Sequence, residues 1–206
     1  MRQLSAVSSL PDFQRVMMLA AQRTRKLLNQ TDLAHDATHR YLNLLETGCL
    51  VTRIRPVATN PSAALVKAPK LLWTDCGLAA WLAGIKSSAD ATQRLDAGFW
   101  LEQTLFQTLD TWRALDSQRR KLHFWRDRAG HEVDFILEEA GKLVALEIKA
   151  GSQVTTGDLI GIRAFRDALK PKKSLVRGVV LHSGKSRPLD ADDIALPWGW
   201  MVPEPR

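Results

Sequence analysis

The chain has 206 residues, of which 45% are hydrophobic and 25% charged, a balance typical of a globular protein. This length fits one large domain or two small ones. The sequence contains no run of about 18 apolar residues, which argues against a transmembrane helix. The amino terminus lacks the basic start and apolar stretch of a signal peptide, and two cysteines are too few for a disulfide scaffold. We therefore expect a cytoplasmic protein with reduced cysteines and no membrane partner.

The excess of positive charge lies mainly in the first half of the chain. Twenty-nine Lys and Arg against twenty-two Asp and Glu give a net charge of +7. Residues 1–90 carry 11 basic and 6 acidic side chains, a net +5, whereas residues 91–206 carry 18 and 16, a net +2. A polyanionic partner such as DNA is favoured, and the first half is its expected docking surface.

The first half predicts helices followed by a basic hairpin. Apolar residues at helical spacing predict a helix over residues 12–29, and THRYLNLLE predicts another that ends at Gly48. Between them, TDLAHD offers capping residues for a short helix. The apolar, β-branched run CLVTRIRPV predicts a strand, residues 58–67 a loop, and LLWTD with GLAAWLAGI a strand end and a helix. Helix, short helix, helix and hairpin is the order of a winged helix-turn-helix.

In a winged helix, the THRYLNLLE helix would enter the major groove of DNA, and the hairpin would reach the phosphates. The predicted nucleic-acid contacts are Thr38, His39, Arg40, Arg53, Arg55 and Lys67. The other interpretation is a small helical domain that packs against a partner domain. LAHDATHRYL leaves almost no room for the usual turn of about 3–4 residues between the second and third helices, which favours this second interpretation.

The polar segment KSSADATQ, at residues 86–93, predicts a boundary between two domains that cover residues 1–88 and 89–206. Beyond it, periodicity predicts a helix over 98–112, three strands in KLHFWRD, HEVDFILEE and KLVALEIKA, a helix over 158–169, and a buried strand in SLVRGVVLHSG. The second domain is therefore predicted to have the order α-β-β-β-α-β, within an α/β (α+β) fold class.

The segment HEVDFILEEAGKLVALEIKA carries the candidate chemistry. A hairpin closed at Ala140-Gly141 pairs residues whose numbers sum to 281, so Asp134 faces Glu147. By the same rule Glu132 faces Lys149, and because side chains alternate along a strand, Glu132, Asp134, Glu147 and Lys149 share a face. Opposed residues place their Cβ atoms about 5 Å apart. The hairpin therefore predicts two neighbouring carboxylates with a lysine beside them.

Two facing carboxylates repel each other unless a cation lies between them, and a hard divalent cation such as Mg²⁺ or Mn²⁺ takes oxygen ligands. Lys149 could orient an attacking water or help to deprotonate it. An ammonium near two anions stays charged, which favours orientation. A bound metal lowers the pKa of its water and stabilises charge on a phosphoryl oxygen, so the predicted chemistry is phosphodiester hydrolysis. The alternative is an exposed strand face held by cross-strand ion pairs.

Asp134 followed by Glu147-Ile148-Lys149, on a helix-strand-strand-strand-helix-strand core, resembles the PD-(D/E)xK nuclease superfamily, which has the restriction-endonuclease-like fold. The resemblance implies that Asp134 and Glu147 bind the divalent metal, that Ile148 lends its backbone carbonyl, and that Lys149 positions water. Many members also carry an acidic residue on the preceding helix, and Glu102 matches it. The resemblance thus implies Asp134, Glu147, Ile148 and Glu102 as metal ligands.

A wider resemblance covers nearly the whole chain. The succession LNQTDLAHDATHRYLNLLE, KAPKLLWTDCGLAAWL, GFWLEQTLFQTL, FWRDRAGHEVDFILE and LEIKAGS is similar to the C-terminal portion of a large prokaryotic family. Its members are predicted AAA-type P-loop ATPases followed by a winged helix and a nuclease-like domain of unknown function. The present sequence contains no GxxxxGK[ST] loop, so the resemblance implies no ATPase activity for it.

These observations predict a divalent-metal-dependent nuclease that hydrolyses DNA phosphodiester bonds and docks on DNA through a basic winged helix. One alternative is a non-catalytic DNA- or protein-binding module, a truncated relative of an AAA-type ATPase with an ATPase or another protein as partner. A transcriptional regulator is a further alternative, although it leaves the acidic hairpin face without a role.

Overall fold

The computed structural model describes residues 7, 9–23, 36–57, 68–93, 97–116, 119–169 and 176–201. These residues form a mixed α/β fold, and none of their helices is both long and apolar enough to cross a membrane. The chain divides into two compact units. The first comprises Met1–Ile54 and Ala68–Gln103, and the second comprises Arg55–Lys67 and Thr104–Arg206.

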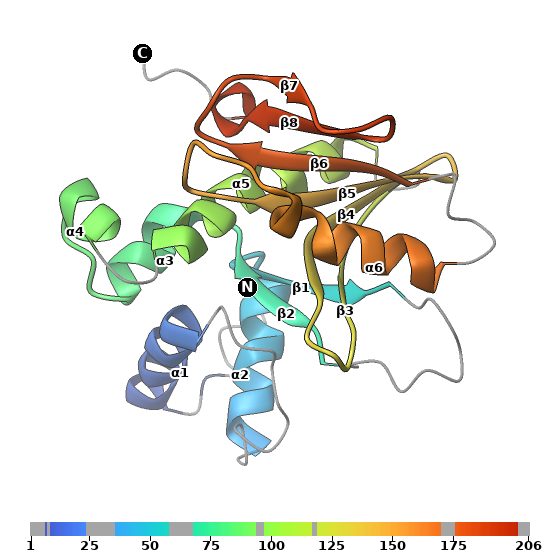
Figure 1. The fold of residues 1–206 in the computed structure, drawn as a ribbon. Helices are drawn as coiled ribbons and strands as arrows, with labels where there is room; N and C mark the ends of the chain where they lie inside the picture. The colour runs from blue at the N-terminus through green and yellow to red at the C-terminus, as the bar shows by residue number, and fades with distance from the viewer. Residues whose placement is uncertain are drawn as a thin grey trace. The chain divides into compact units, whose positions relative to one another are not determined.

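The described part of the first unit consists of helices around one hairpin (Figure 1). Its elements are α1 (Leu10–Arg23), α2 (Asp36–Thr47), β1 (Val51–Pro56), β2 (Lys70–Trp73), α3 (Cys76–Leu82), α4 (Ser88–Gln93) and the start of α5 (Ala97–Leu115). Strands β1 and β2 pair antiparallel, from Val51 opposite Trp73 to Ile54 opposite Lys70. The predicted helices and strands of this half are confirmed where they are described, whereas residues 31–35 of TDLAHD and the loop over residues 58–67 lie outside the described residues. The polar segment at residues 86–93, expected to be a linker or loop, forms helix α4 from Ser88 instead, because serine and aspartate also favour the first turn of a helix.

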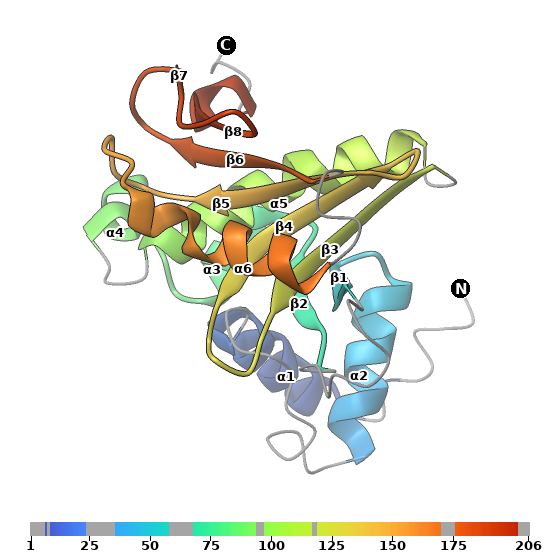
Figure 2. The same cartoon turned by 45° about the vertical axis from the view of Figure 1, so that its right-hand side comes forward.

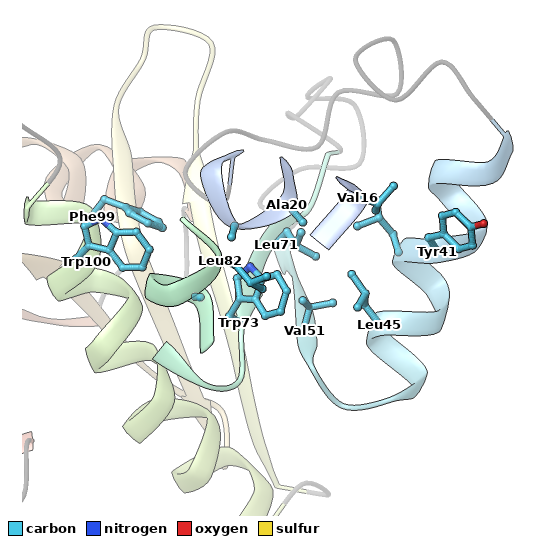
Figure 3. Close-up of a cluster of buried hydrophobic side chains, with 13 residues drawn as sticks. Val16, Ala20, Tyr41, Leu45, Val51, Leu71, Trp73, Leu82, Phe99 and Trp100 are labelled. Carbon is cyan, nitrogen blue, oxygen red and sulfur yellow. The ribbon is translucent and has the colours of Figure 1, made fainter. Parts of the chain in front are cut away.

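The core of the first unit joins α1 and α2 to the hairpin. Figure 3 shows Trp73 and Leu71 of β2 beside Val51 of β1 and Leu45 of α2, and each of these four side chains is at most 1% exposed. Burying a side chain of this size contributes about 1.5–3 kcal/mol. The hairpin is therefore held by apolar packing against the helices of its own unit.

The second unit is built on a mixed sheet (Figures 1 and 2). Its elements after α5 are β3 (Arg120–Arg126), β4 (Glu132–Glu139), β5 (Lys142–Ile148), the 3-10 helix η3 (Thr156–Leu159), α6 (Ile160–Ala168), β6 (Val176–His182), β7 (Arg187–Pro188), β8 (Asp193–Pro197) and the 3-10 helix η5 (Trp198–Met201). Within this unit the strand order is β3-β4-β5-β6-β8-β7. Strands β3, β4 and β5 pair antiparallel, whereas β5–β6 and β6–β8 pair parallel.

Helices α5 and α6 cover opposite faces of this sheet (Figures 1 and 2). On one face, Phe135 of β4 stacks on Phe106 of α5 with ring centroids 6.1 Å apart. On the other, Ile136 belongs to a buried cluster with Ile162 and Phe165 of α6. Since side chains alternate along β4, Asp134 shares the α6 face with Ile136.

The predicted order α-β-β-β-α-β is confirmed by α5, β3, β4, β5, α6 and β6. Strands β7 and β8, which were not predicted, extend the sheet beyond β6. Trp73 and Trp100 are buried, whereas Trp81, at an apolar position of α3, is 73% exposed. The winged-helix and restriction-endonuclease-like assignments remain predictions.

The predicted domain boundary differs in position from the division into units. The first unit extends to Gln103, inside α5, whereas the polar segment predicts the boundary at residue 88. Helix α5 thus contributes residues to both units, a continuity that polar composition does not reveal.

Candidate functional site

The β4–β5 hairpin has the predicted register. Its residue pairs run from Phe135 opposite Leu146 to Glu139 opposite Lys142, and the two residue numbers of each pair sum to 281. Ala140 and Gly141 close the turn with φ values of 50° and 76°, the two positive values that a type I′ hairpin turn requires. The register therefore places Asp134 and Glu147 at the next opposed position, beyond the end of the paired segment.

Asp134 reaches across this end of the hairpin. Its Oδ2 accepts a hydrogen bond from the backbone N–H of Ile148 at 2.9 Å. The Asp134 carboxylate of β4 thus contacts the residue between Glu147 and Lys149. Asp134, Glu147, Ile148 and Lys149 therefore meet at the carboxyl end of β5.

Glu147 is a largely buried acid beside a second carboxylate. Its side chain is 16% exposed, and its Oε1 accepts a hydrogen bond from Lys149 Nζ at 2.9 Å. Burial raises the pKa of Glu147, and the negative charge of Asp134 raises it further, so that it reaches about 7 despite the opposing effect of Lys149. The charge of Glu132, at the start of β4, acts in the same direction.

Lys149 lies between two carboxylates. Besides the hydrogen bond to Glu147, its Nζ is 3.6 Å from Asp158 Oδ1, and its side chain is 36% exposed. Burial lowers the pKa of Lys149, but the hydrogen bond to Glu147 and the charges of Glu147, Asp158 and Asp134 outweigh burial and raise it. Lys149 therefore stays protonated near neutral pH, in agreement with the expected charged ammonium.

Asp158 was not predicted as a site residue. It lies in η3, where its Oδ2 accepts hydrogen bonds from the backbone N–H of Thr155 at 2.7 Å and from the Thr155 hydroxyl at 3.0 Å. Burial raises the pKa of Asp158, but these bonds and the charge of Lys149 outweigh that effect and lower it. A signal was available, because Thr155-Thr156-Gly157-Asp158 has capping-box spacing at the start of a predicted helix.

Glu102 lies in the first unit. Its Oε1 is 3.1 Å from Lys70 Nζ, and the two side chains are 15% and 7% exposed. The resemblance implied Glu102 as an additional metal ligand, and the structure pairs it with Lys70 of β2, a residue of the KAPKLLWTDCGLAAWL segment. The metal-binding role of Glu102 remains a prediction.

Within the described ranges, no group of three or more His, Cys, Asp or Glu side chains is arranged to hold a metal ion. The site on the hairpin therefore offers two carboxylates, from Asp134 and Glu147, rather than a cage of side chains. Mg²⁺ usually keeps several waters and is bound through one or two carboxylates, so this donor set fits it.

The predicted nucleic-acid contacts have different surroundings. His39 and Arg40 are exposed on α2, and Arg55 is exposed near the end of β1. Arg53, in contrast, is 23% exposed and contacts Glu46 at 3.2 Å and the side-chain carbonyl of Asn43. Arg53 thus joins β1 to α2 within the first unit. The Thr38 side chain and Lys67 lie outside the described residues.

Two family models match successive parts of the chain, on either side of residues 90–96. Residues 97–201, just over half of the chain, match the model of a family described as domain of unknown function DUF4143. The chain belongs to this family. The DUF4143 domain occurs in proteins associated with AAA-type ATPases, which confirms the coarser part of the sequence resemblance. It contains Glu102, the β4–β5 hairpin and Asp158. Residues 1–89 match domain of unknown function DUF8612.

Two curated relatives of this DUF4143 protein are longer than the chain. Uncharacterized protein Rv2008c of Mycobacterium tuberculosis and uncharacterized protein Mb2031c of Mycobacterium bovis are each 28% identical over 178 residues, which is 84% of this chain and 37% of each relative. The crystal structure of protein VC1899 from Vibrio cholerae matches 91% of this chain and 44% of that chain with 14% identity and a TM-score of 0.33.

Proposed function

We propose that this DUF4143 protein is a divalent-metal-dependent nuclease that hydrolyses DNA phosphodiester bonds at the end of the β4–β5 hairpin. The observation that carries the proposal is the charge balance around Glu147. Burial and the neighbouring Asp134 raise its pKa to about 7, although Lys149 donates a hydrogen bond to it. A site with more negative charge than its lysine offsets favours a bound cation.

Asp134, Glu147 and the backbone carbonyl of Ile148 would hold Mg²⁺ or Mn²⁺. All three donors are oxygens, the ligand type that these ions prefer. When bound, the ion would acidify a water and stabilise negative charge on the phosphoryl oxygen. The hydrogen bond from the Ile148 N–H fixes the Asp134 carboxylate against the strand that carries the other two donors.

Lys149 would orient the reacting groups. A protonated ammonium has three donors and no acceptor, so it can hold a water or a phosphate oxygen but cannot take a proton. The partial exposure of Lys149 leaves it within reach of a substrate, whereas Glu147 beside it is more buried. The role of general base therefore falls to another group or to the solvent.

The first half of the chain would dock the substrate. Its net charge of +5 and the exposed side chains of His39, Arg40 and Arg55 support contact with phosphates. We expect the DNA affinity to fall with added salt, and Arg40→Ala and Arg55→Ala to reduce the slope of that dependence. Affinity that is independent of salt would argue against this docking surface.

The test is cleavage of supercoiled plasmid and of single- and double-stranded oligonucleotides with Mg²⁺ or Mn²⁺. We expect Asp134→Ala and Lys149→Ala to abolish cleavage, while Glu139→Gln, on the same hairpin but at its turn, retains it. Glu139 forms an exposed ion pair with Arg120 and serves as the matched control. Absence of cleavage with every metal and substrate form would refute the nuclease proposal.

Calorimetric titration of Mg²⁺ and Mn²⁺ tests the ligand set separately. Glu147→Ala should abolish divalent binding, and Glu139→Gln should leave it unchanged. If Glu147→Ala binds the metal as the wild type does, the proposed ligands are wrong.

The second candidate is a non-catalytic module that binds DNA or a protein, with an AAA-type ATPase as a possible partner class. The association of the DUF4143 domain with such ATPases favours it. Metal binding without cleavage, together with salt-dependent DNA binding, would support this candidate over the nuclease.

A further inference from the structure

We propose that Asp158 is a positioning residue that holds the Lys149 ammonium in place for the reaction. This inference rests on the proposed nuclease function for its catalytic consequence. Its structural part, the control of Lys149 by Asp158, can be tested without any activity.

The two oxygens of Asp158 have different contacts. Oδ2 accepts both hydrogen bonds from Thr155, at 2.7 and 3.0 Å, whereas Oδ1 is 3.6 Å from Lys149 Nζ. The two bonds on Oδ2 fix the plane and position of the carboxylate. Oδ1 is thereby presented to Lys149 by a group that has little freedom of its own.

The loop between Lys149 and Thr155 is anchored at several points. The Lys149 N–H donates to the Leu181 carbonyl at 2.8 Å, and the Ser183 N–H donates to the Gly151 carbonyl at 3.1 Å. Farther along, Arg187 donates to the Val154 carbonyl at 2.7 Å. These bonds tie the loop to the end of β6 and to β7, so η3 and Asp158 are held relative to the end of β5.

A second anion is needed because the lysine stem is long. An ammonium at the end of four methylene groups can still change its position while it contacts a single partner. A second partner restricts that movement. In the proposed reaction the charge of Glu147 is shared with the metal, so Glu147 holds Lys149 less strongly. Asp158, which is not among the proposed metal ligands, would then retain the ammonium and its orientation.

The alternative is that Asp158 only caps η3, and substitutions separate the two roles. Asp158→Asn keeps an amide oxygen for the Thr155 N–H but removes the charge that faces Lys149. Asp158→Glu restores the charge, and Asp158→Ala removes both functions. Asp192→Asn is the matched control, because Asp192 is an exposed acid of the same unit that pairs with Arg177.

The experiment compares the variants in cleavage, metal binding and thermal unfolding. For Asp158→Asn we expect kcat to fall about tenfold, with KM for DNA and Kd for Mg²⁺ changed less than about twofold. Asp158→Glu should recover most of the loss, and Asp192→Asn should match the wild type. If kcat falls in parallel with Tm across the variants and does not recover in Asp158→Glu, Asp158 only caps η3 and the proposal is overturned.

NMR order parameters of the Lys149 Cε methylene, assigned with Lys149→Arg, provide a readout independent of turnover. In metal-free protein they should fall in Asp158→Asn but not in Asp192→Asn. Unchanged order in Asp158→Asn overturns the positioning role whether or not the wild type cleaves DNA. A fall in order combined with no cleavage by the wild type would retain the positioning role and reject the nuclease proposal.

Discussion

The ion pairs near the two ends of helix α6 differ in burial and in charge balance. Near its C-terminal end, Arg166 donates to Asp193, with Nη1 2.9 Å from Oδ2, and also donates to the Val176 carbonyl at 3.2 Å. The Arg166 side chain is 11% exposed and that of Asp193 is 0% exposed. Near its N-terminal end, Lys149 lies between Glu147 and Asp158 and is 36% exposed.

The difference lies in charge balance and access. One arginine offsets one buried carboxylate at the first end, and Gly178 leaves room for it, since a Cβ there would lie 2.1 Å from Asp193 Oδ1. At the second end, one lysine faces several acids and reaches the surface. Buried, balanced pairs hold elements in place, whereas an unbalanced and accessible cluster has capacity for a ligand.

Removing one partner of the balanced pair should have the largest effect. Arg166→Ala leaves Asp193 as an uncompensated buried charge, so we expect the free energy of unfolding to fall by about 3–5 kcal/mol. Urea denaturation measures this. Arg177→Ala is the control, because its pair with Asp192 is 62% and 56% exposed and should contribute almost nothing. Equal losses in both variants would contradict the distinction.

The N-terminal end of α6 is held by close backbone packing. A Cβ at Gly161 would lie 1.9 Å from the carbonyl oxygen of Glu132, and no side-chain rotation can relieve a contact with backbone. Gly161→Ala should therefore lower the free energy of unfolding by about 1–3 kcal/mol. Gly151→Ala, which meets no atom within 4 Å, should be tolerated. A stable Gly161→Ala protein would mean that α6 does not pack on β4 at this point.

The buried acid Glu147 predicts that the stability of the folded protein falls as pH rises. A carboxylate in an ordinary salt bridge has the opposite effect. The pKa of Glu147 is about 7 in the folded protein against 4.5 as the ordinary value, so between these pH values the folded state binds more protons than the unfolded state. Stability contributed by this group is thus lost as pH rises from 4.5 to 7. Metal-free Glu147→Gln should be more stable than the wild type by about 2 kcal/mol at pH 8 and equally stable near pH 4.5.

Denaturant titrations of wild type and Glu147→Gln across this pH range measure the difference. Glu139→Gln is the control, because its carboxylate is exposed at the other end of the hairpin. A wild type that is more stable than Glu147→Gln at pH 8 would show that Lys149 fully offsets the acids.

Local sequence rules predicted the hairpin, but they could not predict that Asp158 would approach Lys149. The register of the β4–β5 hairpin follows from its two-residue turn and from the alternation of side chains along each strand. Both features lie within about twenty consecutive residues. The approach of Asp158 to Lys149 depends on how η3 and α6 pack on β4 and β6, which involves contacts such as Gly161 with Glu132. Likewise, Arg53 carries the same charge as Arg55 in the sequence, and only the fold reveals that Glu46 and Asn43 engage it.

The turn that sets the register provides the smallest expected effect. Ala140 has a φ of 50°, where a residue with a Cβ is strained by about 1–2 kcal/mol and glycine is not. The extra flexibility of glycine in the unfolded chain cancels about 0.5–1 kcal/mol of that gain. Ala140→Gly should therefore raise the free energy of unfolding by about 0.5–1 kcal/mol, measured by urea denaturation. Because the register is unchanged, Asp134 still faces Glu147, and metal affinity should match the wild type. A variant that gained stability but lost metal binding would show that the hairpin had shifted its pairing and that the facing carboxylates depend on this turn.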